Sequence, residues 1–313
     1  MARLVVSLAG RKAVNGYPLF KKVRCMITHF TRRKFIRTLT GGILASAALG
    51  DALEYAVAGE NSDGYRLVWH DEFNRDGPVN PNNWEYEHGF VRGKELQWYQ
   101  PQNARCVDGR LIISARRETV VNPGYQADSS DWRKRRRVAH YTSSSIKTRG
   151  KHSWKYGIFI MRGRINTHPG SWPAWWTIGD HKPWPAGGEI DIMEYYRGHI
   201  NANVAWQGAN GHAKWKSVFK PIVQFHDPNW SSRFHIWAMH WEADAIRLFL
   251  DGHLMNHVDL SQTHDPRYNN YNPFHHKAFM ILNLAIGGAG GDPSHTEFPV
   301  LFEVDYVRVY QRL

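Results

Sequence analysis

Near the end of the chain, residues 302–310 read Phe302-Glu303-Val304-Asp305-Tyr306-Val307-Arg308-Val309-Tyr310. Apolar and polar side chains alternate along this stretch, as in an antiparallel strand with one buried face. Further short β-rich runs occupy 111–115, 157–165, 246–250 and 278–285, and Asp251-Gly252 is a hairpin-turn pair. No heptad, long helical period or internal repeat accompanies them. The pattern predicts an all-β sandwich or barrel.

Composition allows one globular domain, or at most two, because the 313 residues are 42% hydrophobic and 22% charged. The 14 Trp, 14 Tyr and 14 Phe fit either a large β-sheet core or a surface that stacks flat ligands. A net charge of +12 suggests nucleic acid or a membrane as partner. However, the first 58 residues carry ten Lys/Arg against Asp51 and Glu54, which leaves only about +4 for the rest. We therefore expect neither partner.

The N-terminal segment is typical of an export signal. Paired arginines in Thr31–Arg37 precede the apolar, small-residue run Gly41–Leu49, and Ala56-Val57-Ala58 resembles a cleavage site. We predict a twin-arginine-type signal with an upstream extension over 1–58, removed to leave an exported protein, periplasmic or extracellular, of residues 59–313. The alternative is an ordinary buried or amphipathic helix. Cys106 is the one cysteine in 59–313, so no disulfide is expected within that part.

A cluster of acidic residues lies in an apolar stretch, 184–196, which reads Trp184-Pro185-Ala186-Gly187-Gly188-Glu189-Ile190-Asp191-Ile192-Met193-Glu194-Tyr195-Tyr196. Acids are depleted in strands, and burying them without partners is costly. Glu189 and Asp191 are two residues apart and share one face of a strand, whereas Glu194 would fall on the other face. A β-bulge near Ile192-Met193 would bring Glu194 back to the face of the other two acids.

Two glutamates on one face of a strand can flank a glycosidic bond. One attacks the anomeric carbon and the other protonates the leaving oxygen, while Asp191 between them is placed to hydrogen-bond the nucleophile. Such closeness predicts a separation of roughly 5–5.5 Å, that of a retaining enzyme. The alternatives are a chance spacing and a divalent-metal cluster. A metal cluster would need more oxygen ligands nearby or a Gly-turn loop, and the sequence has neither.

These residues resemble the signature E-[I/L/V]-D-x-x-E of glycoside hydrolase family 16, and ordered matches to the family cover about residues 65–312. The matching stretches are Trp69-His70-Asp71-Glu72-Phe73, Glu95-Leu96-Gln97-Trp98-Tyr99 with Asn103, Val107-Asp108-Gly109-Arg110-Leu111, Tyr141-Thr142-Ser143, Trp154-Lys155-Tyr156-Gly157, Trp172-Pro173-Ala174-Trp175-Trp176, Asn283-Leu284-Ala285-Ile286-Gly287-Gly288 and 304–310. Several of them resemble its laminarinase (endo-β-1,3-glucanase) branch.

The resemblance implies a β-jelly-roll sandwich of two antiparallel sheets with a long cleft on its concave face. It implies a retaining, endo-acting hydrolase of β-1,3- or mixed β-1,3/1,4-glucans that needs no cofactor for catalysis. Glu189 would be the nucleophile, Asp191 its assistant and Glu194 the acid/base. The implied substrate-binding residues are Glu95, Gln97, Trp98, Trp172, Trp176, Asn203, Trp206 and His235. A structural calcium is implied at Asp305, the backbone of Gly109 and the region of Glu72.

One segment departs from the laminarinase pattern. Residues 200–206 read Ile200-Asn201-Ala202-Asn203-Val204-Ala205-Trp206, where laminarinases commonly carry an H-G-x-x-H-like segment. Trp206 could stack a sugar there, and Asn203 could replace a histidine hydrogen bond. The polysaccharide stays open, because the same fold serves agars, porphyrans and carrageenans. A transglycosylase would use the same residues, and a non-catalytic carbohydrate-binding homologue would have lost an acid.

The remaining polar stretches receive plainer interpretations. Residues 119–140 read as a loop, and its basic run Arg133–Arg137 is interpreted as solvated, with a polyanionic glycan as the alternative ligand. His240 and His275-His276 lack the spacing of metal ligands, and Gly287–Gly291 reads as a turn or cleft rim. We expect a monomer whose partner is its polysaccharide substrate.

Overall fold

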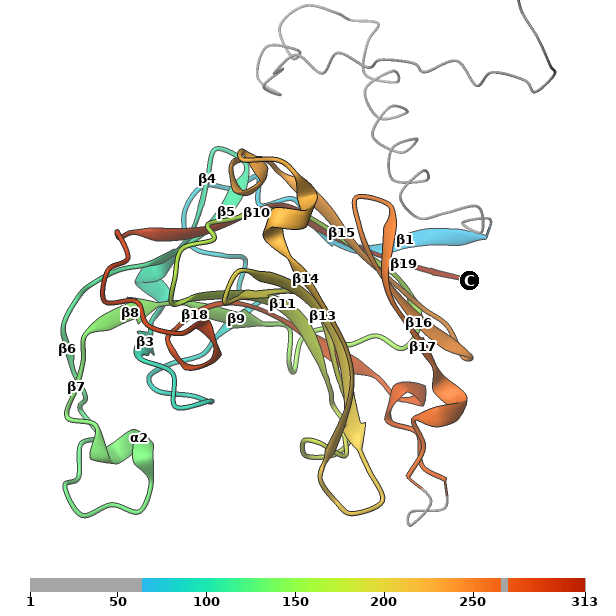
Figure 1. Cartoon of the computed structure of the whole chain (residues 1–313), viewed down its shortest axis with the longest axis horizontal. Helices are drawn as coiled ribbons and strands as arrows, with labels where there is room; N and C mark the ends of the chain where they lie inside the picture. Colours follow the sequence, from blue (N-terminus) through green and yellow to red (C-terminus); the bar gives the residue numbers. More distant parts are fainter. Residues whose placement is uncertain (1–63, 266–269, 313) are drawn as a thin grey trace, which may run out of the picture. The chain divides into compact units, whose positions relative to one another are not determined.

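The structure, a computed structural model, describes residues 64–265 and 270–312. In this part of the chain two antiparallel sheets pack face to face as a β-jelly-roll sandwich, which confirms the predicted fold class (Figure 1). The export signal predicted over 1–58 lies outside the described residues. Among the residues that are described, no helix has the length and apolar character to cross a membrane.

The first sheet is called the β10 sheet. It contains, in spatial order, β17 (His253–Asp259), β16 (Ala245–Leu250), β15 (His235–Trp241), β10 (Gly157–Ile165), β19 (Val300–Arg312), β5 (Arg110–Ala115) and β4 (Ala104–Val107), while β1 (Tyr65–Asp71) pairs with the end of β19. Four predicted strands lie here, within two residues of their expected bounds. Asp251 and Gly252 have φ values of 49° and 78°, which form the predicted hairpin turn between β16 and β17.

The second sheet, called the β12 sheet, carries the acidic cluster. Its spatial order is β14 (Ala213–Pro221), β13 (His199–Gln207), β12 (Glu189–Tyr196), β11 (Ser171–Gly179), β18 (Ala278–Ile286), β9 (Ser145–Lys147) and β2 (Glu85–Tyr86). Smaller elements are β3 (Gln97–Tyr99) parallel to β8 (Tyr141–Ser143), the pair β6 (Val120–Val121) and β7 (Val138–Ala139), the helix α2 (Trp132–Arg135), and the 3-10 turns η2 (Pro101–Asn103), η3 (Ile222–Phe225), η4 (Trp230–Ser232), η5 (Leu260–Gln262), η7 (Pro273–His275) and η8 (Gly288–Gly290).

The core lies between the two sheets and takes most of the tryptophans. Strand alternation sends every second side chain inward, so that β18 contributes Met280, Leu282 and Leu284, each fully buried. The tryptophans buried in this core are Trp84, Trp154, Trp175, Trp206, Trp230, Trp237 and Trp241, while Trp176 is buried on the outer face of the β12 sheet. Burying a large apolar side chain contributes about 1.5–3 kcal/mol, so the aromatic content mainly stabilises the sandwich. Trp184 and Trp215 are exposed and need another explanation.

The stretch 119–140 is more ordered than the predicted loop. It forms the hairpin of β6 and β7 with α2 at its end (Figure 1). Arg133 donates hydrogen bonds to the carbonyl of Val91, and Arg136 donates to the carbonyls of Lys94 and Glu95. Part of the basic run therefore holds the neighbouring 91–95 segment in place.

Candidate active site

Strand β12 brings its acidic residues to one face by means of a β-bulge. Asp191 lies opposite Trp176 and Asn203, but Glu194 lies opposite Ala174 and Asn201, so β12 has one residue more than each neighbour over this interval. Ile192 and Met193 both point into the core. The predicted bulge is confirmed, and it places the acids on the face that turns away from the core.

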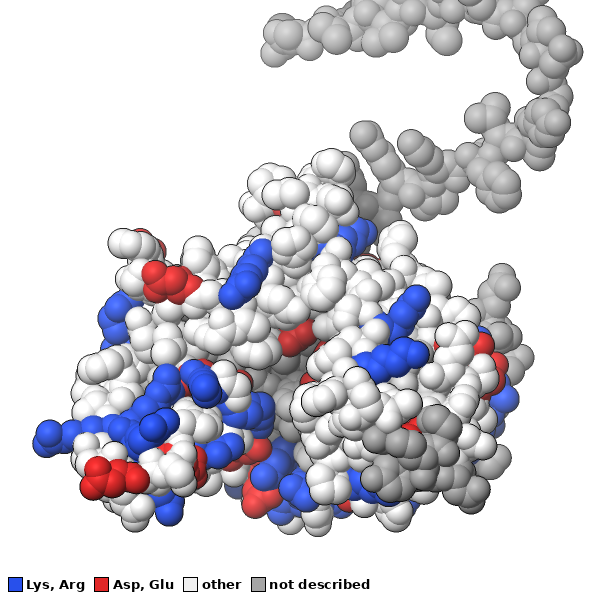
Figure 2. Space-filling model, turned by 60° about the horizontal axis from the view of Figure 1, so that its bottom comes forward, with Lys and Arg blue, Asp and Glu red and all other residues white. Residues whose placement is uncertain are grey.

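This outer face of the β12 sheet is hollowed into a groove. Figure 2 shows acidic residues at its floor and Lys and Arg gathered along one side. The floor strands β11, β12, β13 and β18 present alternate residues to it, among them Trp176, Asp191, Asn203 and Asn283. The rigid strands therefore hold the site, while loops form its rims.

Glu194 is held between two hydrogen-bond donors. The indole nitrogen of Trp172 donates to Oε1 over 2.6 Å, and the amide of Asn203 donates to Oε2 over 3.0 Å. Burial raises the pKa of Glu194 to about 7, and the charge of Glu189 adds to the rise. A carboxyl group with this pKa can hold a proton near neutral pH and give it to a leaving oxygen.

Glu189 and Asp191 form a second, hydrogen-bonded pair. Burial, and then the charges of Glu189 and Glu194, raise the pKa of Asp191 well above its usual range. Burial also raises the pKa of Glu189, but hydrogen bonds from Asp191 and from the indole of Trp184 oppose the rise, as does the charge of Arg92. The proton of this pair therefore belongs on Asp191, and the negative charge belongs on Glu189.

A polar network lies beside the three acids. The indole of Trp176 donates to Asn283 over 2.7 Å, the amide of Asn283 donates to the hydroxyl of Tyr99 over 3.2 Å, and this hydroxyl donates to Glu95. Gln97 donates to Glu95 and accepts from the backbone N–H of Ile286. Gln97 is 1% exposed and holds the carboxylate of Glu95, while its contact with sugar hydroxyls stays a prediction.

The comparisons with known proteins agree with this geometry. The model for glycosyl hydrolases family 16 matches residues 95–307. This chain belongs to glycosyl hydrolase family 16. A β-glucanase of Rhodothermus marinus is 32% identical over 86% of this chain and 93% of its own length. This chain is therefore a glycoside hydrolase.

Solved structures give the same assignment. An endo-1,3-β-glucanase (laminarinase) catalytic domain from Thermotoga petrophila is 29% identical and superposes with a TM-score of 0.66, covering 79% of this chain and 98% of that one. A structure from work on endo-acting O-glycanases that initiate mucin breakdown, expressed by members of the human gut microbiota, is 30% identical. It superposes with a TM-score of 0.73, covering 80% of this chain and 92% of that one.

Two predicted substrate contacts in the hydrolase are wrong. Trp206 points into the core and is 4% exposed, because it lies three residues from Asn203 and so on the other face of β13. His235 is buried on β15 of the other sheet, where it stacks on Trp230 and bonds to Asp251. Trp98 is partly exposed and packs against Phe90, and its contact with a sugar stays a prediction.

The residues implied for calcium in the hydrolase do not fit a calcium ion. The carboxylate of Asp305 pairs with Arg162 over 2.8 Å, and that of Glu72 pairs with Arg308 through two bonds of 2.6 and 2.9 Å. Arginine therefore already neutralises both carboxylates. In the described ranges no three His, Cys, Asp or Glu residues gather as a metal site.

The prediction missed several residues of the groove. Arg92 lies 5.2 Å from the ring of Trp176, Tyr196 packs on Trp172, and Trp184 bonds to Glu189. Trp184 and Tyr196 bound the acidic stretch in the sequence, so their position there was a usable signal. The sequence around Arg92 gave no such signal, because only the fold brings its loop over β11.

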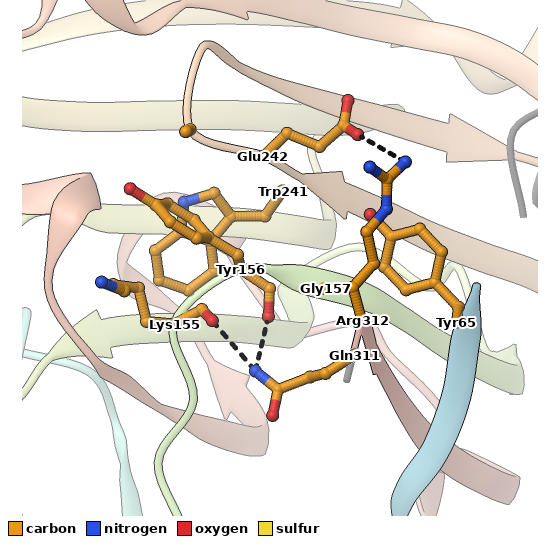
Figure 3. A pocket seen from close by; sticks show the side chains of 9 residues that line it. Tyr65, Lys155, Tyr156, Gly157, Trp241, Glu242, Gln311 and Arg312 are labelled. Carbon is orange, nitrogen blue, oxygen red and sulfur yellow. Dashed lines mark hydrogen bonds and ion pairs between the residues drawn. The ribbon is translucent and has the colours of Figure 1, made fainter. Parts of the chain in front are cut away.

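Another hollow of the hydrolase, of about 230 Å³, contains none of these acids. Its lining includes Tyr65, Tyr156 and Glu242 (Figure 3). The amide of Gln311 donates to the carbonyls of Lys155 and Tyr156 across it. These bonds join the end of β19 to the start of β10, which is a structural role.

Proposed function

We propose that this hydrolase cleaves β-1,3- or mixed β-1,3/1,4-glucans internally, with retention of configuration. The observation that supports this most is the bulged strand β12, which presents Glu189, Asp191 and Glu194 together on the floor of the groove. The named β-glucanase and laminarinase relatives support the substrate class.

The proposed reaction has two displacements. The Glu189 carboxylate attacks the anomeric carbon, the glycosidic C–O bond breaks, and the proton of Glu194 goes to the leaving oxygen. A water molecule then attacks the same carbon, gives its proton to the Glu194 carboxylate, and releases Glu189 from the ester. Asp191 donates its hydrogen bond to Glu189 in the free enzyme and steadies the leaving carboxylate in the second step.

Substrate class is tested by reducing-sugar release from laminarin, mixed-linkage β-glucan, mucin glycoprotein, agar, porphyran and carrageenan. We expect release from the first two. Mucin is included because the O-glycanase structure superposes with a higher TM-score than the laminarinase structure. Release only from mucin or from a galactan would keep the mechanism and refute the substrate.

The acid/base assignment has a separate test. Glu194→Ala should lose activity on laminarin, and azide should restore turnover of a substrate with an activated leaving group, because azide needs no base to attack the glycosyl-enzyme. Glu189→Ala is the comparison variant. Azide can there only replace the missing carboxylate and should give the α-glycosyl azide, whereas attack on the glycosyl-enzyme of Glu194→Ala should give the β-glycosyl azide. Azide rescue of neither variant would contradict the assignment of Glu194.

We also propose that residues 1–58 direct export by a twin-arginine route and that the catalytic part is a monomer. Replacing Arg32 and Arg33 by lysine should leave the protein in the cytoplasmic fraction of a bacterial host, while replacing Lys21 and Lys22 by arginine should not. Export of the first variant would refute the signal. Light scattering at the mass of a dimer would refute the monomer.

A further inference from the structure

Two exposed aromatic side chains lie on strand β14. Trp215 is 45% exposed and Phe219 is 53% exposed, although large apolar side chains are usually buried. Phe219 lies directly opposite Asn201, and Trp215 lies opposite Ala205. Residues opposite each other in an antiparallel pair share a face. Both aromatic rings therefore lie on the groove face, the face from which Asn203 bonds to Glu194.

A row of rings connects Phe219 to the candidate acid/base. Phe219 meets Tyr196 edge to face at 6.4 Å, and Tyr196 meets Trp172 edge to face at 5.9 Å. Trp172 in turn donates its indole N–H to Glu194. The row crosses the β12 sheet from β11 to its edge strand, and it is continuous with the site of bond cleavage.

The lysine side chains of β14 lie on the face opposite to the groove. Lys214 lies over the core-facing ring of Trp206 at 5.4 Å, and Lys220 lies over Phe225 at 4.5 Å. Because alternate residues of a strand face opposite sides, the lysines are directed away from the groove while Trp215 and Phe219 face it. The face that β14 presents to the groove is thus apolar and free of its lysines, which suits the apolar C–H faces of sugar rings.

We propose that Tyr196 and Phe219 form a platform that binds neutral glucose residues of the substrate on the leaving-group side of the scissile bond. The side follows from Glu194, since the group that protonates the leaving oxygen, and the rings attached to it, face the departing part of the chain. The inference rests on the proposed β-glucanase function and adds the residues that hold the leaving oligosaccharide.

The test compares the full chain with its Phe219→Ala variant on two substrates. Laminarihexaose fills both sides of the scissile bond, whereas β-laminaribiosyl fluoride has no sugar on the leaving-group side. We expect kcat/KM for laminarihexaose to fall about tenfold, mainly through KM, and kcat/KM for the fluoride to stay within about twofold. Phe219→Trp should restore most of the loss.

Leu254→Ala is the matched control, because Leu254 is a 54% exposed apolar residue on an edge strand of the other sheet. It should change neither rate, and both alanine variants should keep the melting temperature of the wild type. If Phe219→Ala left kcat/KM for laminarihexaose unchanged, or lowered kcat/KM equally for both substrates, the platform would be refuted. The platform would also be refuted if sedimentation showed that the wild type is a dimer and that Phe219→Ala is a monomer. If the wild type cleaves no β-glucan, the proposed function fails first and the platform fails with it.

Discussion

At the residue scale, three carboxyl groups on one strand differ in protonation state. Asp191 is held protonated by burial and by its two charged neighbours, Glu189 is favoured as the anion, and Glu194 titrates near pH 7. Environment alone separates them, because all three would ionise near pH 4 in water. The sequence predicted this division of roles in outline, since neighbouring acids in an apolar strand must shift one another.

The pH profile should report Glu194 directly. Activity needs its protonated form, so kcat/KM should fall as pH rises through about 7. The hydrogen bond from Trp172 lowers the pKa of Glu194. Trp172→Phe removes that donor, and the alkaline limb should move up by roughly one pH unit. Trp176→Phe is the control, because its indole bonds to Asn283. A limb that stays in place in Trp172→Phe would refute the assignment.

The same group should limit stability above neutral pH. A carboxyl whose pKa is raised by folding stabilises the fold below its unfolded pKa, and this contribution is lost as pH rises through about 7. Glu194→Gln cannot ionise, so its melting temperature should exceed that of the wild type by several degrees at pH 8 and by little at pH 5. Glu85→Gln, at a largely exposed side chain, serves as control. A constant difference across pH would contradict this.

At the element scale, the β12 bulge explains how acids five residues apart share a face. Ile192 is the extra residue, because its neighbours Asp191 and Met193 keep their partners Trp176 and Trp175 on β11. The sequence was sufficient to predict the bulge. Without it, regular alternation along the strand would put Glu194 on the face opposite to Glu189 and Asp191.

Deleting Ile192 should therefore leave Glu194 on the groove face with regular alternation. We expect measurable activity, above that of Glu194→Gln, and a lower melting temperature because a buried isoleucine is lost, at a cost of about 2–5 kcal/mol. Met193→Ala removes a similar core side chain and keeps the bulge, so it separates stability from geometry. A folded deletion variant as inactive as Glu194→Gln would show that the bulge itself sets the catalytic geometry.

Strand parity also shows where the sequence interpretation went wrong. The sequence analysis placed both Asn203 and Trp206 in the cleft. Residues three positions apart on a regular strand point to opposite faces, so strand alternation could have excluded one of the two. Phe219 could not have been found in this way. Only its pairing with Asn201 shows that its face of β14 is the groove face.

At the scale of the whole molecule, sequence patterns predicted the sandwich well because each strand carries its own alternation and turn residues. They did not predict long-range ion pairs. Glu303 on β19 pairs with Arg164 and Arg110, which lie on the two strands beside it. Such pairs depend on which strands become neighbours, and that order is a property of the complete fold.

The long-range pairs of Asp305 and Glu72 give a prediction about metal. Because Arg162 and Arg308 neutralise these carboxylates, the melting temperature should be the same, within about 1 °C, in excess EDTA and in millimolar calcium. Magnesium serves as the control for ionic strength. A rise that calcium produces and magnesium does not, lost in Asp305→Asn, would establish the calcium site that the family resemblance implied.

Glu189 is the proposed nucleophile, and its attack on the anomeric carbon leaves a covalent intermediate. Mass spectrometry of the protein incubated with 2-deoxy-2-fluoro-β-laminaribiosyl fluoride detects this intermediate, because the fluorinated glycosyl-enzyme forms quickly and is hydrolysed slowly. We expect one added fluorolaminaribiosyl group per chain, located on the peptide that contains Glu189 and absent from Glu189→Gln. A label on another residue, or no label on a protein that cleaves laminarin, would contradict this assignment.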